Sequence, residues 1–152
     1  MAILVTGGAG FIGSHTCVEM LNAGYEVIVV DNLCNASEEA IRRVEKITGK
    51  NVTFYKADIR DKEALDQIFD KESVECVIHF AGLKAVGESV EKPIEYYTNN
   101  LTTTLIVAKM MKKYHVNNIV FSSSATVYGD PEVVPLTEDC KLGETTNPYG
   151  AS

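Results

Sequence analysis

The stretch AILVTGGAGFIGSH, residues 2–15, decides the fold of this chain. Its first five residues are apolar or β-branched, and such a short run predicts a buried strand. Gly7, Gly10 and Gly13 follow at the spacing G-x-x-G-x-x-G, and G-x-G-x-x-G is also present from Gly8 onward. Glycines permit a tight turn and a close approach of a pyrophosphate to the backbone, while the next helix offers that anion its free N–H groups. The stretch therefore predicts the start of a dinucleotide-binding fold; the alternative is a purely structural glycine turn.

The rest of the chain alternates between short apolar runs and longer segments with helical periodicity. The predicted strands are residues 2–6, 26–31, 52–57, 75–80 and 117–123, and the predicted helices are residues 12–23, 37–48, 61–71 and 93–114. Continuous apolar strands separated by helices indicate a parallel sheet that is covered on both faces. Five strands with four crossovers predict a doubly wound α/β sheet in the order 3-2-1-4-5. We expect one domain over residues 1–152, in which residues 129–146 form a long loop.

The composition is that of an ordinary soluble protein, with 45% hydrophobic and 23% charged residues. A net charge of −7 argues against binding to nucleic acid or to an anionic membrane surface, since both need a basic patch. No apolar run approaches the ~18 residues that cross a bilayer, and the first residues lack the basic segment of a signal peptide. The four cysteines are widely spaced, which favours free thiols over disulfides or a metal site. These features predict a cytoplasmic protein without a bound metal.

Asp31 is the last residue of the second predicted strand and lies 18 residues after Gly13. A carboxylate at this place can accept hydrogen bonds from the ribose hydroxyls of an adenosine, and it repels a phosphate on the 2′ position. The sequence therefore predicts that the cofactor is NAD rather than NADP.

Further motifs extend along the whole chain. They are TGGAGFIG (6–13), DNLCN (31–35), ADIRD (57–61), HFAGLKAVGES (79–89), YYTNN (96–100) and SSSATVYG (122–129). Together they resemble the extended short-chain dehydrogenase/reductase family, and within it the branch that epimerises nucleotide sugars. The resemblance implies a Rossmann domain that binds NAD, and a protein that forms a homodimer at full length.

That family has a Ser just beyond the fifth strand and a Tyr-x-x-x-Lys pair on one helix, so the resemblance implies catalytic roles for Ser124 and Tyr149. Asn147 is a favoured N-cap and Pro148 fits a first helical position, which predicts a helix start immediately before Tyr149. The sequence ends one position before the expected Lys. We therefore expect an N-terminal portion that is truncated before this Lys and lacks the domain that holds the substrate.

The expected chemistry explains why these residue types occur together. A phenol is a poor base near neutral pH unless its anion is stabilised, and an ammonium group four residues later would lie one helical turn away on the same face. Ser124 can hydrogen-bond the reacting hydroxyl and relay its proton. Taken alone, Tyr149 could be a half-buried aromatic residue, and residues 122–124 could be turn formers that cap a strand.

Ala125 and Thr126 follow Ser124, where related dehydratases have Asp and Glu after a Thr. Neither residue can supply the extra acid and base that an elimination needs. The resemblance therefore implies hydride removal and return at carbon 4 of a UDP-hexose, with UDP-glucose and UDP-galactose as the substrates. The alternatives are a non-catalytic NAD-binding fragment and another extended short-chain dehydrogenase that acts on nucleotide sugars.

Further cofactor contacts follow from the resemblance. They are implied for Phe11, Ile12, Asn32, Asp58, Ile59, Phe80, Ala81, Gly82, Lys84 and Asn99, in addition to Gly7, Gly10, Gly13 and Asp31. Asp58 and Ile59 would flank the adenine, and Lys84 would contact the nicotinamide ribose or a substrate phosphate. The alternatives are a turn residue for Asp58 and a solvated surface residue for Lys84.

The remaining polar candidates receive no chemical role. Asn100 is assigned none, and the histidines share no spacing that suits a metal. We interpret His15 and His79 as hydrogen-bonded polar groups, and His115 as a surface residue near a helix end.

Overall fold

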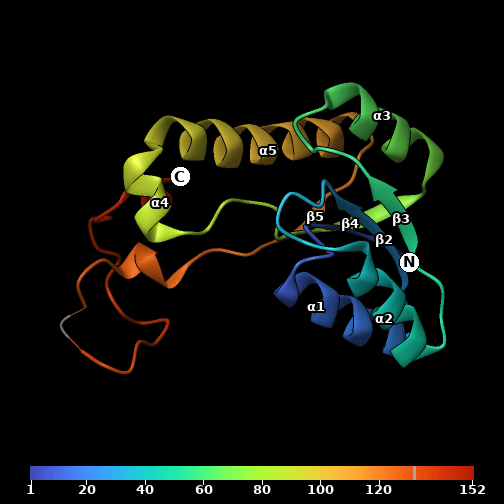
Figure 1. The fold of residues 1–152 in the computed structure, drawn as a ribbon, viewed down its shortest axis with the longest axis horizontal. Coiled ribbons are helices and arrows are strands. Elements are labelled where there is room, and N and C mark those ends of the chain that lie inside the picture. Colours follow the sequence, from blue (N-terminus) through green and yellow to red (C-terminus); the bar gives the residue numbers. More distant parts are fainter. Residues whose placement is uncertain (132) are drawn as a thin grey trace. The chain divides into compact units, whose positions relative to one another are not determined.

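The computed structural model describes residues 1–131 and 133–152, and its elements follow one another as Figure 1 shows. The strands are β1 (Ala2–Thr6), β2 (Glu26–Asp31), β3 (Thr53–Lys56), β4 (Val74–His79) and β5 (Asn118–Phe121). The helices are α1 (Phe11–Asn22), α2 (Glu38–Thr48), α3 (Lys62–Lys71), α4 (Val86–Glu91), α5 (Pro93–Lys113), the 3₁₀ turn η1 (Ala125–Tyr128) and α6 (Pro148–Ala151). The five strands form one parallel sheet in the order β3-β2-β1-β4-β5, which confirms the predicted topology.

Local sequence signals explain where the helices begin and end. Ser37 accepts a hydrogen bond from the backbone N–H of Glu39 and caps α2, and Gly49 ends that helix in a left-handed conformation. Asp61 caps α3 in the same way, because its carboxylate accepts a hydrogen bond from the N–H of Ala64. Side-chain oxygens at these positions satisfy donors that a helix cannot satisfy internally.

The sheet is buried on both faces, as the continuous apolar strands predict. On one face, where Figure 1 draws α3 and α5, the core is formed by Leu4, Ile28, Val77, Leu65, Ile68, Phe69, Val107 and Met110. On the other face, with α1 and α2, it is formed by Ile3, Val5, Val29, Ile78, Cys17, Leu21, Ile41 and Val44. The edge strand β5 is exposed along its whole length.

The strand register brings the ends of the central strands to one level. Thr6, the last residue of β1, pairs with Val30 of β2 and with His79 of β4. The loops that leave β1, β2 and β4 therefore start from the same edge of the sheet. This carboxyl edge is where ligands bind in open parallel sheets.

Several elements differ from the expectation, among them α4 and β5. The short helix α4 was not predicted, because Val86–Glu91 contains Gly87 and Ser89 and is only six residues long. The fifth strand ends at Phe121 and not at residue 123, so Ser124 lies in the following turn, where it caps η1. The prediction that residues 129–146 form a long loop is confirmed for the part of this segment that the structure describes.

The chain divides into two compact units. The first comprises Met1–Gly82 and Thr103–Ser122, and it contains the whole sheet with α1, α2 and α3. The second comprises Leu83–Thr102 and Ser123–Ser152, and it contains α4, η1 and α6. Among the described residues, no helix combines the length and apolar character that crossing a membrane requires.

Candidate active site

The glycine turn after β1 is built so tightly that side chains are excluded. Gly7 has a φ of +70°, which L-residues rarely adopt. A Cβ on Gly13 would lie 2.3 Å from the carbonyl oxygen of Gly7, and a Cβ on Gly8 would lie 2.7 Å from a methyl group of Val29. The glycines are therefore required by the packing of the turn against α1 and the sheet.

The N-terminus of α1 is open to an anion. Gly10 precedes the helix and has no side chain to cap it, and the first turn carries no acidic residue. The N–H groups of this turn thus lack internal acceptors, as at every helix start. Phe11 and Ile12 are 82% and 54% exposed, which is unusual for apolar residues beside a core. This arrangement fits a bound pyrophosphate, with apolar cofactor atoms against Phe11 and Ile12.

Asp31 ends β2 and supports the glycine turn directly. Its side chain is buried, and its two oxygens accept hydrogen bonds from the N–H of Ala9 at 3.0 Å and of Leu33 at 2.8 Å. The carboxylate is thereby fixed between the glycine turn and the loop that follows β2. Each oxygen keeps a further lone pair that can accept a hydrogen bond from a ribose hydroxyl.

Asp58 lies in the turn after β3 and binds its neighbours tightly. Its carboxylate accepts hydrogen bonds from the backbone and guanidinium of Arg60, and Asn32 donates to it from the loop after β2 at 3.2 Å. These donors, mainly the Arg60 side chain, hold the pKa of Asp58 well below its usual range. Ile59 is 4% exposed and belongs to the core. Asp58 thus has the turn role that we considered as the alternative, and its contact with adenine stays a prediction.

The loop that leaves β4 begins beside β1. The N–H of Phe80 donates to the carbonyl of Thr6 at 3.0 Å, and the N–H of Ala81 lies 3.4 Å from the hydroxyl of Thr6. Phe80, Ala81 and Gly82 are half-buried at this edge. A Cβ added to Gly7 would lie only 2.8 Å from the backbone nitrogen of Ala81. The structure therefore brings these predicted cofactor residues next to the glycine turn.

The three histidines are arranged as the sequence predicts. His79 is 2% exposed and hydrogen-bonds the hydroxyl of Thr6 at 2.6 Å and that of Thr104 at 3.3 Å. His15 bonds the carbonyl of Phe11, and His115 is an exposed residue just after α5. Within the described residues, no group of three or more His, Cys, Asp or Glu side chains could hold a metal ion.

The second unit holds both predicted catalytic residues. Ser124 caps η1, and its Oγ accepts hydrogen bonds from the N–H of Thr126 at 3.2 Å and from its hydroxyl at 2.9 Å. The hydroxyl of Thr126 also lies 3.1 Å from the position that a Cβ on Gly150 would occupy. Since Gly150 directly follows Tyr149, Thr126 brings the segment of Ser124 against the helix of Tyr149.

The predicted helix start before Tyr149 is confirmed. Asn147 caps α6 by accepting a hydrogen bond from the N–H of Gly150 at 2.8 Å, and Pro148 is the first helical residue. Tyr149 is half-buried, and its catalytic role stays a prediction.

The two asparagines of α5 bond each other, and the predicted contact of Asn99 with the cofactor stays a prediction. Asn99 donates to the side chain of Asn100, and Asn100 in turn bonds Leu83 and Ser152. Sequence reasoning missed Asn100, because its partners lie 17 and 52 residues away along the chain. Lys84, in the same segment as Leu83, is exposed, as expected for a surface residue.

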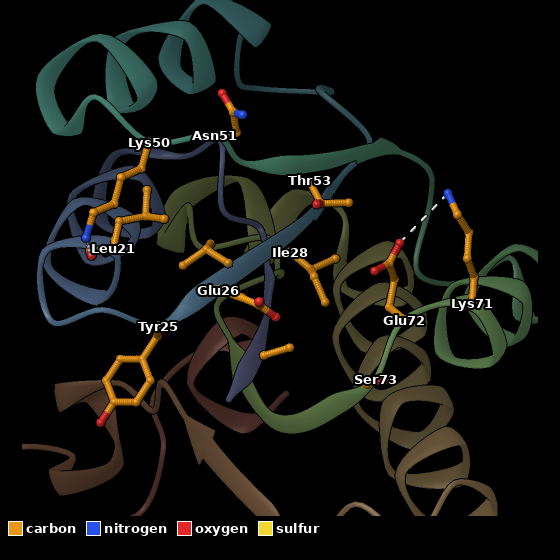
Figure 2. Close-up of a pocket in the computed structure, with 12 residues that line it drawn as sticks. Leu21, Tyr25, Glu26, Ile28, Lys50, Asn51, Thr53, Lys71, Glu72 and Ser73 are labelled. Carbon is orange, nitrogen blue, oxygen red and sulfur yellow. Dashed lines mark hydrogen bonds and ion pairs between the residues drawn. The ribbon is translucent and has the colours of Figure 1, made fainter.

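A pocket of about 540 Å³ lies at the opposite edge of the sheet, as Figure 2 shows. It is lined by the first residues of three strands, namely Ala2, Glu26 and Thr53. Glu72 and Lys71 pair at one side of it, and Lys50 bonds the carbonyl of Leu21 at the other. The pocket contains none of the predicted site residues, which lie at the carboxyl edge.

Comparisons with known proteins agree with this geometry. The chain is 66% identical over 150 residues to the UDP-glucose 4-epimerase of Bacillus subtilis, an alignment that covers 99% of the chain and 44% of the relative. It is 63% identical to the corresponding enzyme of Haemophilus influenzae over 100% of the chain and 45% of the relative. The chain thus spans less than half the length of these curated relatives.

Solved structures give the same result. The UDP-glucose 4-epimerase of Bifidobacterium longum, crystallised with NAD⁺ and UDP, superimposes with a TM-score of 0.97 and is 58% identical; the match covers 99% of this chain and 45% of that one. The model of the family described as NAD dependent epimerase/dehydratase matches residues 3–152. The glycine turn, the carboxylate that supports it and the extended match together establish that this chain belongs to the NAD-dependent epimerase/dehydratase family.

Proposed function

We propose that this chain is the NAD-binding and catalytic portion of a UDP-glucose 4-epimerase. The observation that carries the proposal is the contact of Thr126 with both the Ser124 hydroxyl and the Gly150 position beside Tyr149. The relatives named above, which are UDP-glucose 4-epimerases, support the same activity.

The residues of the first unit fit NAD. The N–H groups at the start of α1 would bind the pyrophosphate, Asp31 would accept the ribose hydroxyls, and residues 80–82 would line the remainder of the cofactor. When bound, NAD supplies the acceptor for a hydride and a positively charged ring.

The second unit supplies the proton chemistry. The phenolate oxygen of Tyr149 would take the proton from the carbon-4 hydroxyl of the sugar, and the resulting phenol would return it after the keto-sugar has turned. The Oγ of Ser124 accepts two hydrogen bonds from Thr126, one from its N–H and one from its hydroxyl. Neither bond uses the hydroxyl proton of Ser124. That proton is available to a substrate oxygen. Neither Ala125 nor Thr126 titrates, which favours epimerisation over the elimination that related dehydratases perform.

The experiment that tests the proposal is conversion of UDP-galactose into UDP-glucose by the full-length protein. We expect turnover without net formation of NADH, because the hydride is returned in each cycle. The matched variant Tyr149→Phe keeps the ring and removes the base, and we expect kcat to fall by about 10²–10⁴-fold. Absence of conversion by the full-length wild type, with NAD bound, would contradict the proposal.

The alternative is that the 152 residues bind NAD without catalysis. The chain spans 44% and 45% of the two relatives named above, so this alternative assigns turnover to residues outside it. A titration of this chain with NAD, run beside the same epimerase assay, separates the alternatives. Binding without turnover would support the binding fragment, and turnover would contradict it.

We further propose that the full-length protein is a cytoplasmic homodimer. Ile94, Tyr97 and Leu101 are exposed and share one face of α5, as their spacing of three and four residues requires. This apolar stripe supports a subunit interface. The four free thiols support a reducing compartment. Light scattering of the full-length protein measures its mass, and a monomer would contradict the dimer.

A further inference from the structure

The short helix α4 is held by a side chain of the neighbouring helix α5. Tyr96 lies near the start of α5 and is only 1% exposed. Its hydroxyl accepts a hydrogen bond from the N–H of Ala85 at 3.1 Å and donates to the carboxylate of Glu88 at 2.9 Å. A buried phenol needs hydrogen-bond partners, and Tyr96 finds both of them in or beside α4.

These two bonds together complete the N-terminus of α4. Ala85 is the N-cap residue and makes no capping bond of its own, and Glu88 is the third helical residue. In a capping box, the acidic side chain at this third position accepts a hydrogen bond directly from the N–H of the N-cap residue. In α4 the hydroxyl of Tyr96 lies between these two groups and bonds both. A residue of α5 thus completes the start of α4, which explains why the sequence of α4 itself carries no start signal.

The protonation states of the surrounding groups favour this arrangement. Burial, and then the bond to Glu88, raises the pKa of Tyr96, so its hydroxyl keeps its proton and can donate. Lys92 bonds the other oxygen of Glu88 at 3.0 Å, and the bonds from Lys92 and Tyr96 lower the pKa of this carboxyl group. Glu88 is therefore an ionised acceptor at neutral pH, and a charged acceptor strengthens the bond from Tyr96.

The peptide group that Tyr96 bonds is the one that joins Lys84 to Ala85. Because a peptide group is planar, a bond to its N–H fixes the orientation of the whole group. The helix that follows is only six residues long, and so short a helix is not stable alone. The placement of the Lys84 backbone therefore depends on the hydroxyl of Tyr96.

We propose that Tyr96 is a positioning residue, which fixes the backbone of Lys84 so that its ammonium group reaches the nicotinamide ribose or a substrate phosphate. The inference rests on the proposed function and on the contact that we expect for Lys84. Tyr96 itself needs no contact with either ligand for this role.

The first test is a double-mutant cycle in the full-length protein, with Lys84→Met, Tyr96→Phe and both together. Calorimetry measures the dissociation constant of NAD from the protein and that of UDP from the NAD-bound protein. Lys84→Met should raise one of these constants by about 10–100-fold, because a charge-assisted hydrogen bond is lost, and the constant that rises identifies the ligand. Tyr96→Phe should raise the same constant by about 3–10-fold. In the Lys84→Met background it should add less than about twofold, since no ammonium group is left to position.

The matched control is Tyr114→Phe, just beyond the other end of α5. The hydroxyl of Tyr114 donates to the backbone carbonyl of Asp66 at 3.1 Å and to its carboxylate at 3.0 Å. The control thus also removes a tyrosine hydroxyl that bonds one backbone group and one carboxylate. It should leave both dissociation constants within about twofold of the wild type. An equal rise in Tyr114→Phe would show that a general loss of stability weakens binding, and would overturn the positioning role.

The second test is hydrogen exchange of the same variants, which needs neither turnover nor ligand. In Tyr96→Phe the amide of Ala85 loses its acceptor, and the amides of Ser89 and Lys92 depend on the helix that starts there. We expect residues 85–92 to exchange at least about fivefold faster, while β1 keeps its wild-type rate. Mass spectrometry of the peptides that cover these residues gives the rates.

The outcomes separate this inference from the proposed function. Unchanged constants in Tyr96→Phe, losses that multiply in the double variant, or unchanged exchange over residues 85–92 would each overturn the positioning role while the epimerase activity stands. The role also fails if Lys84→Met changes neither constant. If the wild type binds NAD and UDP but converts no UDP-galactose, the proposed function fails, and the cycle of dissociation constants still decides about Tyr96.

Discussion

At the scale of single residues, the turn after β1 requires glycine, because an added Cβ would collide with neighbouring atoms. Gly13 must approach Gly7 so closely that even a methyl group would collide with a carbonyl oxygen. Gly87 in α4 is the natural comparison, because an added Cβ there would meet no heavy atom of the described residues within 4 Å. The packing therefore requires glycine at position 13, whereas a larger residue fits at position 87.

We predict that Gly13→Ala lowers the free energy of unfolding by about 1–3 kcal/mol and abolishes NAD binding, because the turn must open to admit the methyl group. Gly87→Ala should raise the free energy of unfolding by about 0.5–1 kcal/mol, since it only lowers the entropy of the unfolded chain. Urea denaturation and NAD titration of both variants measure these effects. Equal stability of the two variants would contradict the tight turn.

Asp31 carries the second prediction at this scale. Asp31→Ala should weaken NAD by about 10–100-fold, because charge-assisted hydrogen bonds to the ribose are lost. NADP should be weakened less, because the same change removes the repulsion of its 2′-phosphate. Fluorescence titration with both cofactors gives the ratio, and an equal loss for both would count against the assignment of Asp31.

Asp58 carries a prediction about pH. Its pKa is lower in the folded state, so its bonds with Arg60 stabilise the fold above its ordinary pKa of about 4 and are lost as the pH falls below that value. Because the side chains of Asp58 and Arg60 are 31% and 45% exposed, the contribution near pH 7 should be below about 1 kcal/mol. Urea denaturation of wild type and Asp58→Asn at pH 7 and pH 3 tests this. The difference between the two proteins should shrink at pH 3, and a larger difference there would refute it.

At the scale of elements, α6 is the helix whose start the sequence predicts most clearly. Asn147 and Pro148 occupy the N-cap and the first helical position, and both signals are local. The helix α4 has no such signal, and its one buried residue, Ser89, is polar. Pattern reasoning therefore finds α6 and misses α4.

We predict that Asn147→Ala destabilises the first turn of α6 by about 1 kcal/mol, because the N–H of Gly150 loses its acceptor. Since this turn carries Tyr149, kcat for UDP-galactose in the full-length protein should fall about fivefold or more. Ser37→Ala removes the cap of α2 at a similar cost and serves as the matched control. Thermal unfolding and kcat are measured together. A parallel loss of kcat in both variants would show that helix capping at α6 has no specific effect.

At the scale of the whole molecule, the order of the sheet follows from the sequence because strands buried on both faces are continuous apolar runs. The apolar runs at β1, β2 and β4 are enough to predict the three central strands of the sheet. The position of Asp31 at the carboxyl edge then follows, because it is the last residue of β2. The contacts of Asn100 cannot be predicted in this way. Its partners, Leu83 and Ser152, are brought together only by the packing of α5, and no local pattern records that packing.

The two units have different parts in the proposed reaction. The first holds the sheet and the glycine turn, and the second holds Ser124 and Tyr149. In the proposed function the first unit binds the pyrophosphate and the adenosine ribose, and the second unit supplies Ser124 and Tyr149 together with the predicted cofactor contacts of Lys84 and Asn99. Variants of Gly13 and Asp31 should change cofactor affinity first, whereas variants of Asn147 should change kcat first.

The most direct measurement is the fate of the hydrogen on carbon 4 of the sugar. The full-length protein is incubated with UDP-galactose that carries deuterium at that carbon, in ordinary water, and the product is analysed by NMR. We predict UDP-glucose that retains deuterium at carbon 4, because the hydride is removed and returned within one site. Product that has exchanged its deuterium with water, or no UDP-glucose at all, would contradict the account.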